Sequence, residues 1–241
     1  MAAITVLTFL KYYAIIYIES EEEDMECAVI NAVEELFNKA GISIKEMWRY
    51  SPDYNALKTY CSENDITFCA GATKIVFPEL FNDIVVKIPL VGTYRNWDGC
   101  RFKEEDKYER YCNDNHLETE VGYYSDCIKN STLEDLFIET EYVGQINNMK
   151  IYIQEKTVPF EQTDFPVFSD DTYASAEESE FYTVVGDDTE TICAFYAEFG
   201  VNKGDEILQE LENWGIRDIH QGNIGYLNGK LKIYDYGGFN P

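Results

Sequence analysis

Histidine is scarce in this sequence, and its cysteines are not paired in any recognisable way. Its 241 residues include two histidines and seven cysteines, and no two cysteines are spaced as Cys-x-x-Cys. Structural zinc sites draw their ligands mainly from these two residue types at short spacings, and a disulfide framework uses an even set of cysteines. The sequence therefore indicates neither kind of scaffold, and we expect a reducing, cytoplasmic environment.

Basic residues are also scarce. The chain has 19 Lys and Arg residues against 45 Asp and Glu residues, a formal net charge of -26. Such a charge repels nucleic-acid phosphates and anionic membranes, so we expect no direct nucleic-acid binding and no membrane, and a protein partner with a basic surface. The apolar opening, residues 1–18, lacks a preceding basic segment and contains Lys11, which favours buried structure over a signal peptide or anchor.

Hydrophobic periodicity predicts an α+β protein. Apolar residues recur at helical spacing in some segments and alternate in others, and the alternating segments are typical of an antiparallel sheet. The acidic stretch 161–190 has no clear period and is predicted to be a long loop or insertion. The predicted helices are 25–41, two within 100–130, 189–200 and 204–215, and the predicted strands are 66–77, 84–90, 136–146 and 149–158.

The dipeptide Asn228-Gly229 predicts a two-residue hairpin turn close to the end of the sequence, because both central positions of that turn need positive φ. Centring the turn there pairs Ile224 with Ile233 and Tyr226 with Leu231. Alternation then places all four of these side chains on one face. Turn chemistry and burial therefore support the same register.

This register brings Asn223 and Asp235 side by side at the open end of the hairpin, with Asp218 five residues upstream of Asn223. Each of these residues alone would be an ordinary turn residue. Together, two carboxylates and an amide oxygen suit a hard divalent cation such as Mg²⁺. The second carboxylate, Asp218, could accept a proton from a substrate hydroxyl.

The segment Asp218-Ile219-His220-Gln221-Gly222-Asn223 resembles the catalytic loop of the protein-kinase-like superfamily, including aminoglycoside and choline phosphotransferases and small phage-type kinases. Asp235-Tyr236-Gly237 resembles the Asp-Phe-Gly motif that follows in that family. The resemblance implies that Asp218 orients or deprotonates the acceptor, and that Asn223 and Asp235 hold Mg²⁺. For His220 it leaves open a catalytic role and a structural hydrogen bond within the loop.

The same resemblance extends to a nucleotide site in the first half of the chain. Lys87 lies on an apolar strand and matches the phosphate-binding lysine of the family, the alternative being an exposed lysine on an edge strand. Val85 shares its face and matches the residue that packs on adenine. Gly71 matches the nucleotide loop, although a single glycine replaces the usual glycine-rich pattern.

A glutamate on the following helix should pair with this lysine. Glu120 is preferred because it lies beside the apolar stripe of that helix. The alternatives are Glu118, Glu104 and Glu105. The strand at 151–158 resembles the hinge strand of the family, which implies that the backbone from Glu155 to Thr157 binds adenine and that Gln154 stands at the back of the pocket.

The resemblance implies a two-lobed kinase-like fold. In it, an antiparallel N-lobe sheet (66–158) follows an N-terminal helical extension (1–65), and a reduced helical C-lobe (159–241) ends after the catalytic hairpin. The activation segment of protein kinases is missing after Gly237, and Ile216 stands where the family usually has histidine. We therefore expect no platform for docking peptides as in ordinary protein kinases.

The function implied is a compact phosphotransferase that uses Mg²⁺ and ATP. Its acceptor is a protein hydroxyl, a small molecule or the enzyme itself, and analogy with phage-type members favours a host protein or the enzyme itself. Two other hypotheses stay open. The protein could be a nucleotide-binding pseudokinase that acts by docking on a partner, or an acidic mimic of nucleic acid that occupies a basic groove.

Overall fold

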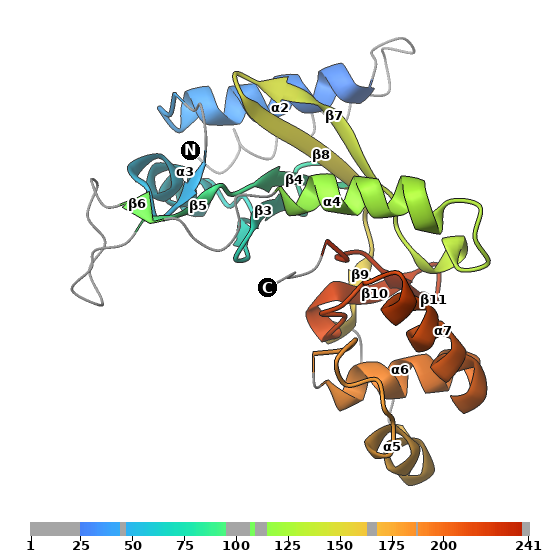
Figure 1. Cartoon of the computed structure of the whole chain (residues 1–241). Helices are drawn as coiled ribbons and strands as arrows, with labels where there is room; N and C mark the ends of the chain where they lie inside the picture. Colours follow the sequence, from blue (N-terminus) through green and yellow to red (C-terminus); the bar gives the residue numbers. More distant parts are fainter. Residues whose placement is uncertain are drawn as a thin grey trace. The chain divides into compact units, whose positions relative to one another are not determined.

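A computed structural model (Figure 1) describes the protein over residues 25–43, 47–94, 107–108, 115–162, 168–186 and 188–237. These residues form an α+β structure with six α-helices and eleven strands. None of the described helices has both the length and the apolar character needed to cross a membrane. The described residues divide into two compact units, the first falling within 1–81, 86–113 and 142–153 and the second within 82–85, 114–141 and 154–241.

An antiparallel five-stranded sheet lies mainly in the first unit. Its strands were predicted from period-two alternation, and all of them fall within the predicted segments. Buried side chains on β3 and β4, such as Ile75, Phe77 and Ile88, account for that pattern. In order across the sheet the strands are β2 (Cys69–Ala70), β3 (Lys74–Phe77), β4 (Ile84–Pro89), β8 (Met149–Glu155) and β7 (Thr140–Ile146).

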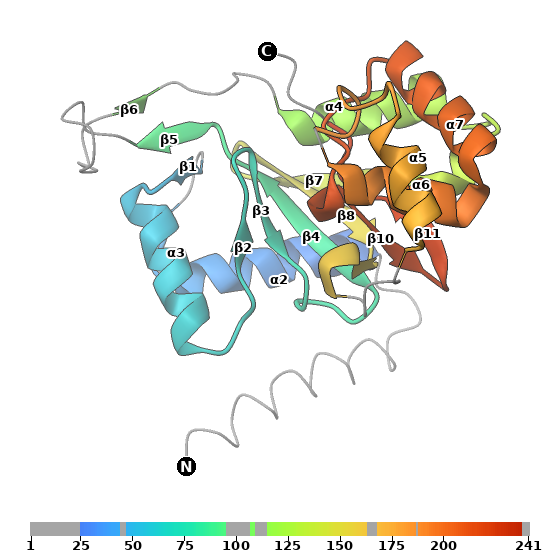
Figure 2. The same ribbon diagram turned by 90° about the horizontal axis from the view of Figure 1, so that it is seen from below.

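Helix α2 (Met25–Lys39) confirms the helix predicted over 25–41. Its Val29, Val33 and Phe37 are buried, as the helical spacing of the apolar residues requires. Figure 1 shows α2 close to β7 and β8, and Figure 2 gives the same elements seen from below. Helix α2 and strand β7 touch at Gly144 of β7, where an added Cβ would lie 3.2 Å from Cδ1 of Ile30.

Helix α3 (Pro52–Glu63) begins with a recognisable cap. The hydroxyl of Ser51 accepts a hydrogen bond from the Tyr54 N–H at 3.1 Å, and proline is well suited to the first helical position. Beside it lies a small sheet of β1 (Trp48–Arg49), β5 (Gly92–Tyr94) and β6 (Lys107–Tyr108).

Strand β6 corrects the first of the two helices predicted within 100–130. Residues 107–108 pair with β5 as an antiparallel strand. At these residues the pairing with a distant strand, and not the local helical pattern, determines the structure. The remainder of that predicted helix, including Glu104 and Glu105, lies outside the described residues. The second predicted helix is confirmed as α4 (His116–Tyr123), which continues into a π-helical turn over Tyr124–Ile128.

Residues 168–186 correct the prediction of an irregular segment over 161–190, because they include helix α5 (Asp170–Glu177). The Ser169 hydroxyl accepts the Thr172 N–H, and Asp170 and Asp171 occupy the first turn, where negative charge is favourable. Ala176 is fully buried. The helix thus depends on capping and one small buried residue, which a search for an apolar stripe overlooks.

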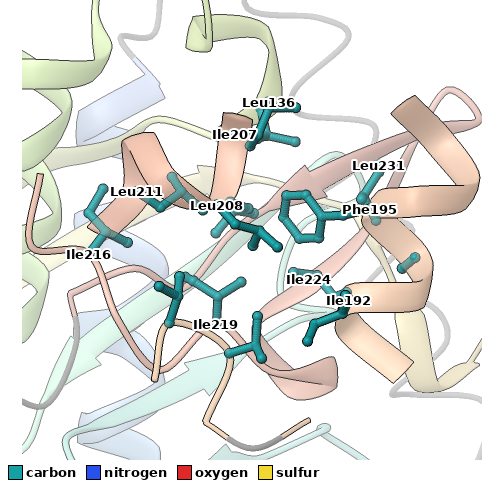
Figure 3. Packing of buried hydrophobic residues seen from close by; sticks show 14 of the residues in the cluster. Leu136, Ile192, Phe195, Ile207, Leu208, Leu211, Ile216, Ile219, Ile224 and Leu231 are labelled. Atoms are coloured by element: carbon teal, nitrogen blue, oxygen red, sulfur yellow. The ribbon is translucent and has the colours of Figure 1, made fainter. Parts of the chain in front are cut away.

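Helices α6 (Thr189–Phe199) and α7 (Val201–Asn213) pack closely in the second unit. An added Cβ at Gly204 of α7 would lie 2.6 Å from the Tyr196 ring of α6, so the close approach of the helices requires glycine there. Figure 3 shows Phe195, Leu208 and Ile219 meeting in one apolar cluster with residues of the terminal hairpin. The helices therefore support the hairpin and the loop that precedes it.

The hairpin is formed by β10 (Ile224–Leu227) and β11 (Lys230–Ile233) in the predicted register. Asn228 and Gly229 have φ values of 53° and 77°, as the turn requires. Ile224, Leu231 and Ile233 are buried. Strand β9 (Val158–Pro159) pairs with the other side of β10, so β10 is the central strand of a three-stranded sheet.

Candidate functional site

Asp218, Asn223 and Asp235 lie around the open end of the hairpin. The Asn223 side-chain nitrogen donates to the carbonyl of Asp218 at 2.6 Å. The backbone carbonyl of Asn223 accepts hydrogen bonds from the N–H of Tyr234 at 3.0 Å and from the N–H of Asp235 at 3.4 Å. Asn223 therefore bonds directly to both of the segments that carry the two carboxylates.

Asp218 has a φ of 65°, a left-handed conformation that is uncommon for a residue other than glycine. Its carbonyl is held by Asn223, and the next residue, Ile219, donates its N–H to the carbonyl of Val184 at 2.9 Å. Such a backbone conformation persists when its surroundings determine it, and it is common at functional sites. The half-buried Asp218 side chain is thus presented from a fixed loop.

The chemistry of this group suits a cation bound by few protein ligands. Because the nitrogen of the Asn223 side chain donates to Asp218, its oxygen is the atom that could bind a metal ion. Among the described residues, no group of three or more His, Cys, Asp or Glu side chains is arranged to hold a metal. A magnesium ion held by one carboxylate and one amide, with phosphates and waters as its other ligands, would need no such group.

His220 has a structural hydrogen bond. Its Nδ1 accepts the N–H of Gly222 at 3.0 Å, so the neutral imidazole carries its proton on Nε2. The ring also lies close to Gly222, where an added Cβ would be 2.9 Å from the His220 Cε1. Of the two roles considered for His220, this geometry provides the structural one directly.

The residues after β11 fasten the hairpin to the rest of the second unit. The Tyr234 hydroxyl donates to the carbonyl of Gly222 at 2.8 Å, and the buried Tyr236 hydroxyl donates to the carbonyl of Ile138 at 3.0 Å. Burial raises the pKa of Tyr236, so this group remains a donor at any physiological pH. Gly237 lies against the first turn of α4, where a Cβ would be 2.4 Å from the His116 carbonyl oxygen.

Glu120 belongs to a buried polar cluster in the second unit. It is fully buried, whereas Glu118 on the same helix is exposed. Its carboxylate accepts from the Thr140 hydroxyl at 2.6 Å. Gln154 is also buried, and its side-chain nitrogen donates to Thr140 Oγ1 at 3.1 Å and to the carbonyl of Ile138 at 2.9 Å. Both residues are therefore held in fixed positions.

Lys87 does not lie on an edge strand. It is 3% exposed, and β4 is an interior strand between β3 and β8. Val85 on the same strand is half-buried. A lysine is rarely buried to this extent unless its ammonium group is paired. The alternative interpretation of Lys87 as an exposed lysine on an edge strand is therefore wrong.

Other predicted nucleotide contacts occupy turns and strand ends. Gly71 is exposed in the turn from β2 to β3, and its N–H donates to the Lys74 carbonyl at 3.0 Å. Glu155 is the exposed last residue of β8, and Thr157 is half-buried just beyond it. Between them, the Lys156 N–H donates to the carbonyl of Asp83 at 2.9 Å.

Asp188 is a residue of this site that sequence reasoning missed. Its Oδ2 accepts from the backbone N–H of Gln221 and from the Thr191 hydroxyl, both at 2.7 Å. Its Oδ1 accepts from the Gln221 side chain at 3.1 Å. Burial by itself would raise the pKa of Asp188, but these hydrogen bonds outweigh it and hold the pKa below its usual value.

Comparisons with known proteins do not add to this description. A scan against protein-family models, a search of curated proteins and a search of solved structures each gave no match. The function is therefore inferred from the residues and geometry given above.

Proposed function

We propose that this protein is a phosphotransferase of the protein-kinase-like type. In this proposal it has a two-lobed arrangement and uses Mg²⁺ and ATP to transfer the γ-phosphoryl group to a hydroxyl of a protein or a small molecule. The observation that carries the proposal is the bonding of Asn223 to the Asp218 carbonyl on one side and to Tyr234 and Asp235 on the other. Phosphoryl transfer depends mainly on positioning and electrostatic stabilisation, which such a framework supplies.

Each residue of the hairpin end has a role in this reaction. The Asn223 side-chain oxygen and the Asp235 carboxylate would bind Mg²⁺, which neutralises charge that develops on the phosphates. The Asp218 carboxylate would accept a hydrogen bond from the acceptor hydroxyl and orient it towards the γ-phosphorus. His220 would act through the loop, since its Nδ1 is already engaged by Gly222.

The nucleotide would be bound by residues of the sheet and its margins. Lys87 would contact the phosphates and pair with Glu120, which is the buried glutamate of α4. Strand β4, which carries Lys87 and Val85, is the immediate neighbour of β8, which includes Gln154 and Glu155 and leads to Thr157. This adjacency supports an adenine site along these strands, with Gly71 near the phosphates.

The negative net charge of the chain favours one kind of phosphate acceptor, a basic protein. A net charge of -26 would attract a protein with a basic surface and repel nucleic acids. We therefore propose a basic protein as the preferred acceptor or partner, in the cytoplasm, where Mg²⁺ and ATP are plentiful.

The test is a calorimetric titration of ATP with and without Mg²⁺, followed by detection of phosphoryl transfer to a panel of basic proteins. Wild type should bind ATP in a Mg²⁺-dependent manner. Asp235→Asn should weaken this binding at least tenfold and abolish transfer. Asp171→Asn makes the same chemical change at an exposed position of α5 and should behave as wild type.

Two outcomes would contradict the proposal in different ways. Absence of ATP binding by the wild type would exclude both an active kinase and a nucleotide-binding pseudokinase. Binding that Asp235→Asn leaves intact, with no transfer by wild type to any acceptor, would favour a pseudokinase that acts by docking.

A further inference from the structure

Asp188 occupies the N-cap position of α6 but does not cap it. An N-cap aspartate usually accepts a hydrogen bond from one of the first backbone N–H groups of its helix. At Asp188 there is no such side-chain bond. Both of its oxygens are used by Gln221 and Thr191 instead, so the side chain of this half-buried residue is turned towards the loop that carries Asp218 and Asn223.

Residues around Asp188 contact the same loop at two further points. The Val184 carbonyl accepts the Ile219 N–H at 2.9 Å. At Gly186, whose φ is 62°, an added Cβ would lie 3.4 Å from Oδ1 of Asp218. Residues 184, 186 and 188 therefore contact residues 219, 218 and 221, respectively. We call residues 184, 186 and 188 the anchoring segment.

Within the anchoring segment, Asp188 makes the contact with the most hydrogen bonds and carries the charge. Hydrogen bonds to an ionised carboxylate are stronger than those between neutral groups. Two of them reach Gln221, which lies between Asp218 and Asn223 in the sequence. The lowered pKa of Asp188 is consistent with a carboxylate that remains ionised in this position.

We propose that Asp188 is a positioning residue for phosphoryl transfer: it fixes the backbone at Gln221 and thereby sets the geometry in which Asp218 meets the acceptor and Asn223 meets the metal. The inference rests on the proposed function and adds a residue to it. Asp188 contacts neither substrate nor metal in this proposal. It acts through the loop, so its loss should affect the rate of transfer much more than the binding of ATP.

Two measurements on Asp188→Ala test the proposal. The first is hydrogen exchange of the Gln221 backbone amide in the protein without nucleotide, which should become at least tenfold faster because its acceptor is gone. The second is steady-state kinetics of transfer, in which kcat should fall by about 100-fold while the KM for ATP stays within about twofold, because a misplaced catalytic group can cost that much. Asp188→Asn keeps an oxygen that can accept the Gln221 N–H and should recover most of the rate.

Thr191→Val is the matched control. This substitution removes the hydrogen bond from the Thr191 hydroxyl to the Asp188 carboxylate and leaves both bonds to Gln221. Thr191 is buried on α6, and valine has nearly the same shape as threonine. Thr191→Val should leave kcat and the exchange of the Gln221 amide close to wild type. If Asp188→Ala fails to fold, Gln221→Ala removes one of the two bonds from the loop side and should lower kcat by a smaller factor with unchanged KM for ATP.

The outcomes separate this inference from the proposed function. Unchanged exchange at Gln221 or unchanged kcat in Asp188→Ala would overturn the positioning role even in an active enzyme. An equal fall in kcat in Thr191→Val would overturn it too, because a general weakening of α6 would then explain the effect. A wild type that binds no ATP and transfers no phosphate would overturn the proposed function, and with it the role of Asp188 in transfer, whatever the exchange result.

Discussion

The loop from Asp218 to Asn223 and the turn between β2 and β3 are the two segments expected to handle the reacting groups, and they are stabilised differently. Backbone groups of the loop bond to the side chains of Asn223 and His220, which belong to it, and to the side chain of Asp188, which lies outside it. In the turn, the described hydrogen bonds join backbone groups: the Gly71 N–H donates to the Lys74 carbonyl, and the Leu90 N–H donates to the Thr73 carbonyl. The side that would hold metal and acceptor is therefore organised before any ligand arrives, which is the usual basis of electrostatic catalysis.

The largest loss of stability should come from Gly225→Ala, which disturbs the strand pairing that supports the loop. A Cβ at Gly225 would lie 2.4 Å from the Val158 carbonyl oxygen and 3.1 Å from the Tyr234 ring. Because the first of these contacts is with backbone, β9 and β10 would have to separate. We expect the free energy of unfolding to fall by about 3 kcal/mol, measured by urea denaturation. A loss below about 0.5 kcal/mol would show that the sheet adapts and that the loop is less rigid than its contacts indicate.

A smaller effect, specific to the loop, should follow substitution of His220. His220→Ala removes the acceptor of the Gly222 N–H and should lower the free energy of unfolding by about 1 kcal/mol and slow phosphoryl transfer by about tenfold. His220→Asn places an oxygen close to the position of Nδ1 and should restore both quantities. Thermal denaturation and transfer assays on the two variants measure this. If His220→Asn were as slow as His220→Ala while fully stable, the imidazole itself would take part in the chemistry.

The smallest effect should come from Gly71→Ala, on the other side of the comparison. The nearest atom to an added Cβ would be the Lys74 carbonyl oxygen at 4.0 Å, which is an ordinary contact. We expect the free energy of unfolding to change by less than about 0.5 kcal/mol and ATP affinity to change by less than about threefold, which is under 1 kcal/mol. Urea denaturation and calorimetry provide the two values. A tenfold loss of ATP affinity would mean that the bound phosphates approach the Gly71 backbone too closely to leave room for a side chain.

The parts of this structure that follow from local chemistry were predictable. Asn228-Gly229 predicts the turn and its register, because few residues accept positive φ at both central positions, and the observed pairing of Ile224 with Ile233 agrees. The strands of the large sheet follow from alternation. From the same register, the spacing of Asp218, Asn223 and Asp235 predicts that these residues come together at the hairpin end, and the hydrogen bonds of Asn223 show how they do so.

Features that depend on distant partners could not be predicted in this way. Asp188 and Gln221 are 33 residues apart in the sequence, and no local pattern connects them. Strand β6 forms because β5 is available to pair with it, although its own residues lie in a helical pattern. For α5 a local signal existed, namely Ser169 followed by two aspartates at a helix start, but its single buried alanine made the apolar stripe too weak to detect.

The hydrogen bond between Tyr236 and the Ile138 carbonyl has a consequence for how the protein folds. The two residues are 98 positions apart in the sequence, whereas the β10–β11 hairpin closes over a two-residue turn. A hairpin of this kind can form within microseconds, but a contact of such long range requires the closure of a large loop, which is slow. The hairpin should therefore appear early in refolding and dock late. The loop from Asp218 to Asn223 would reach its final conformation only in that last step, when the intervening helices have already packed.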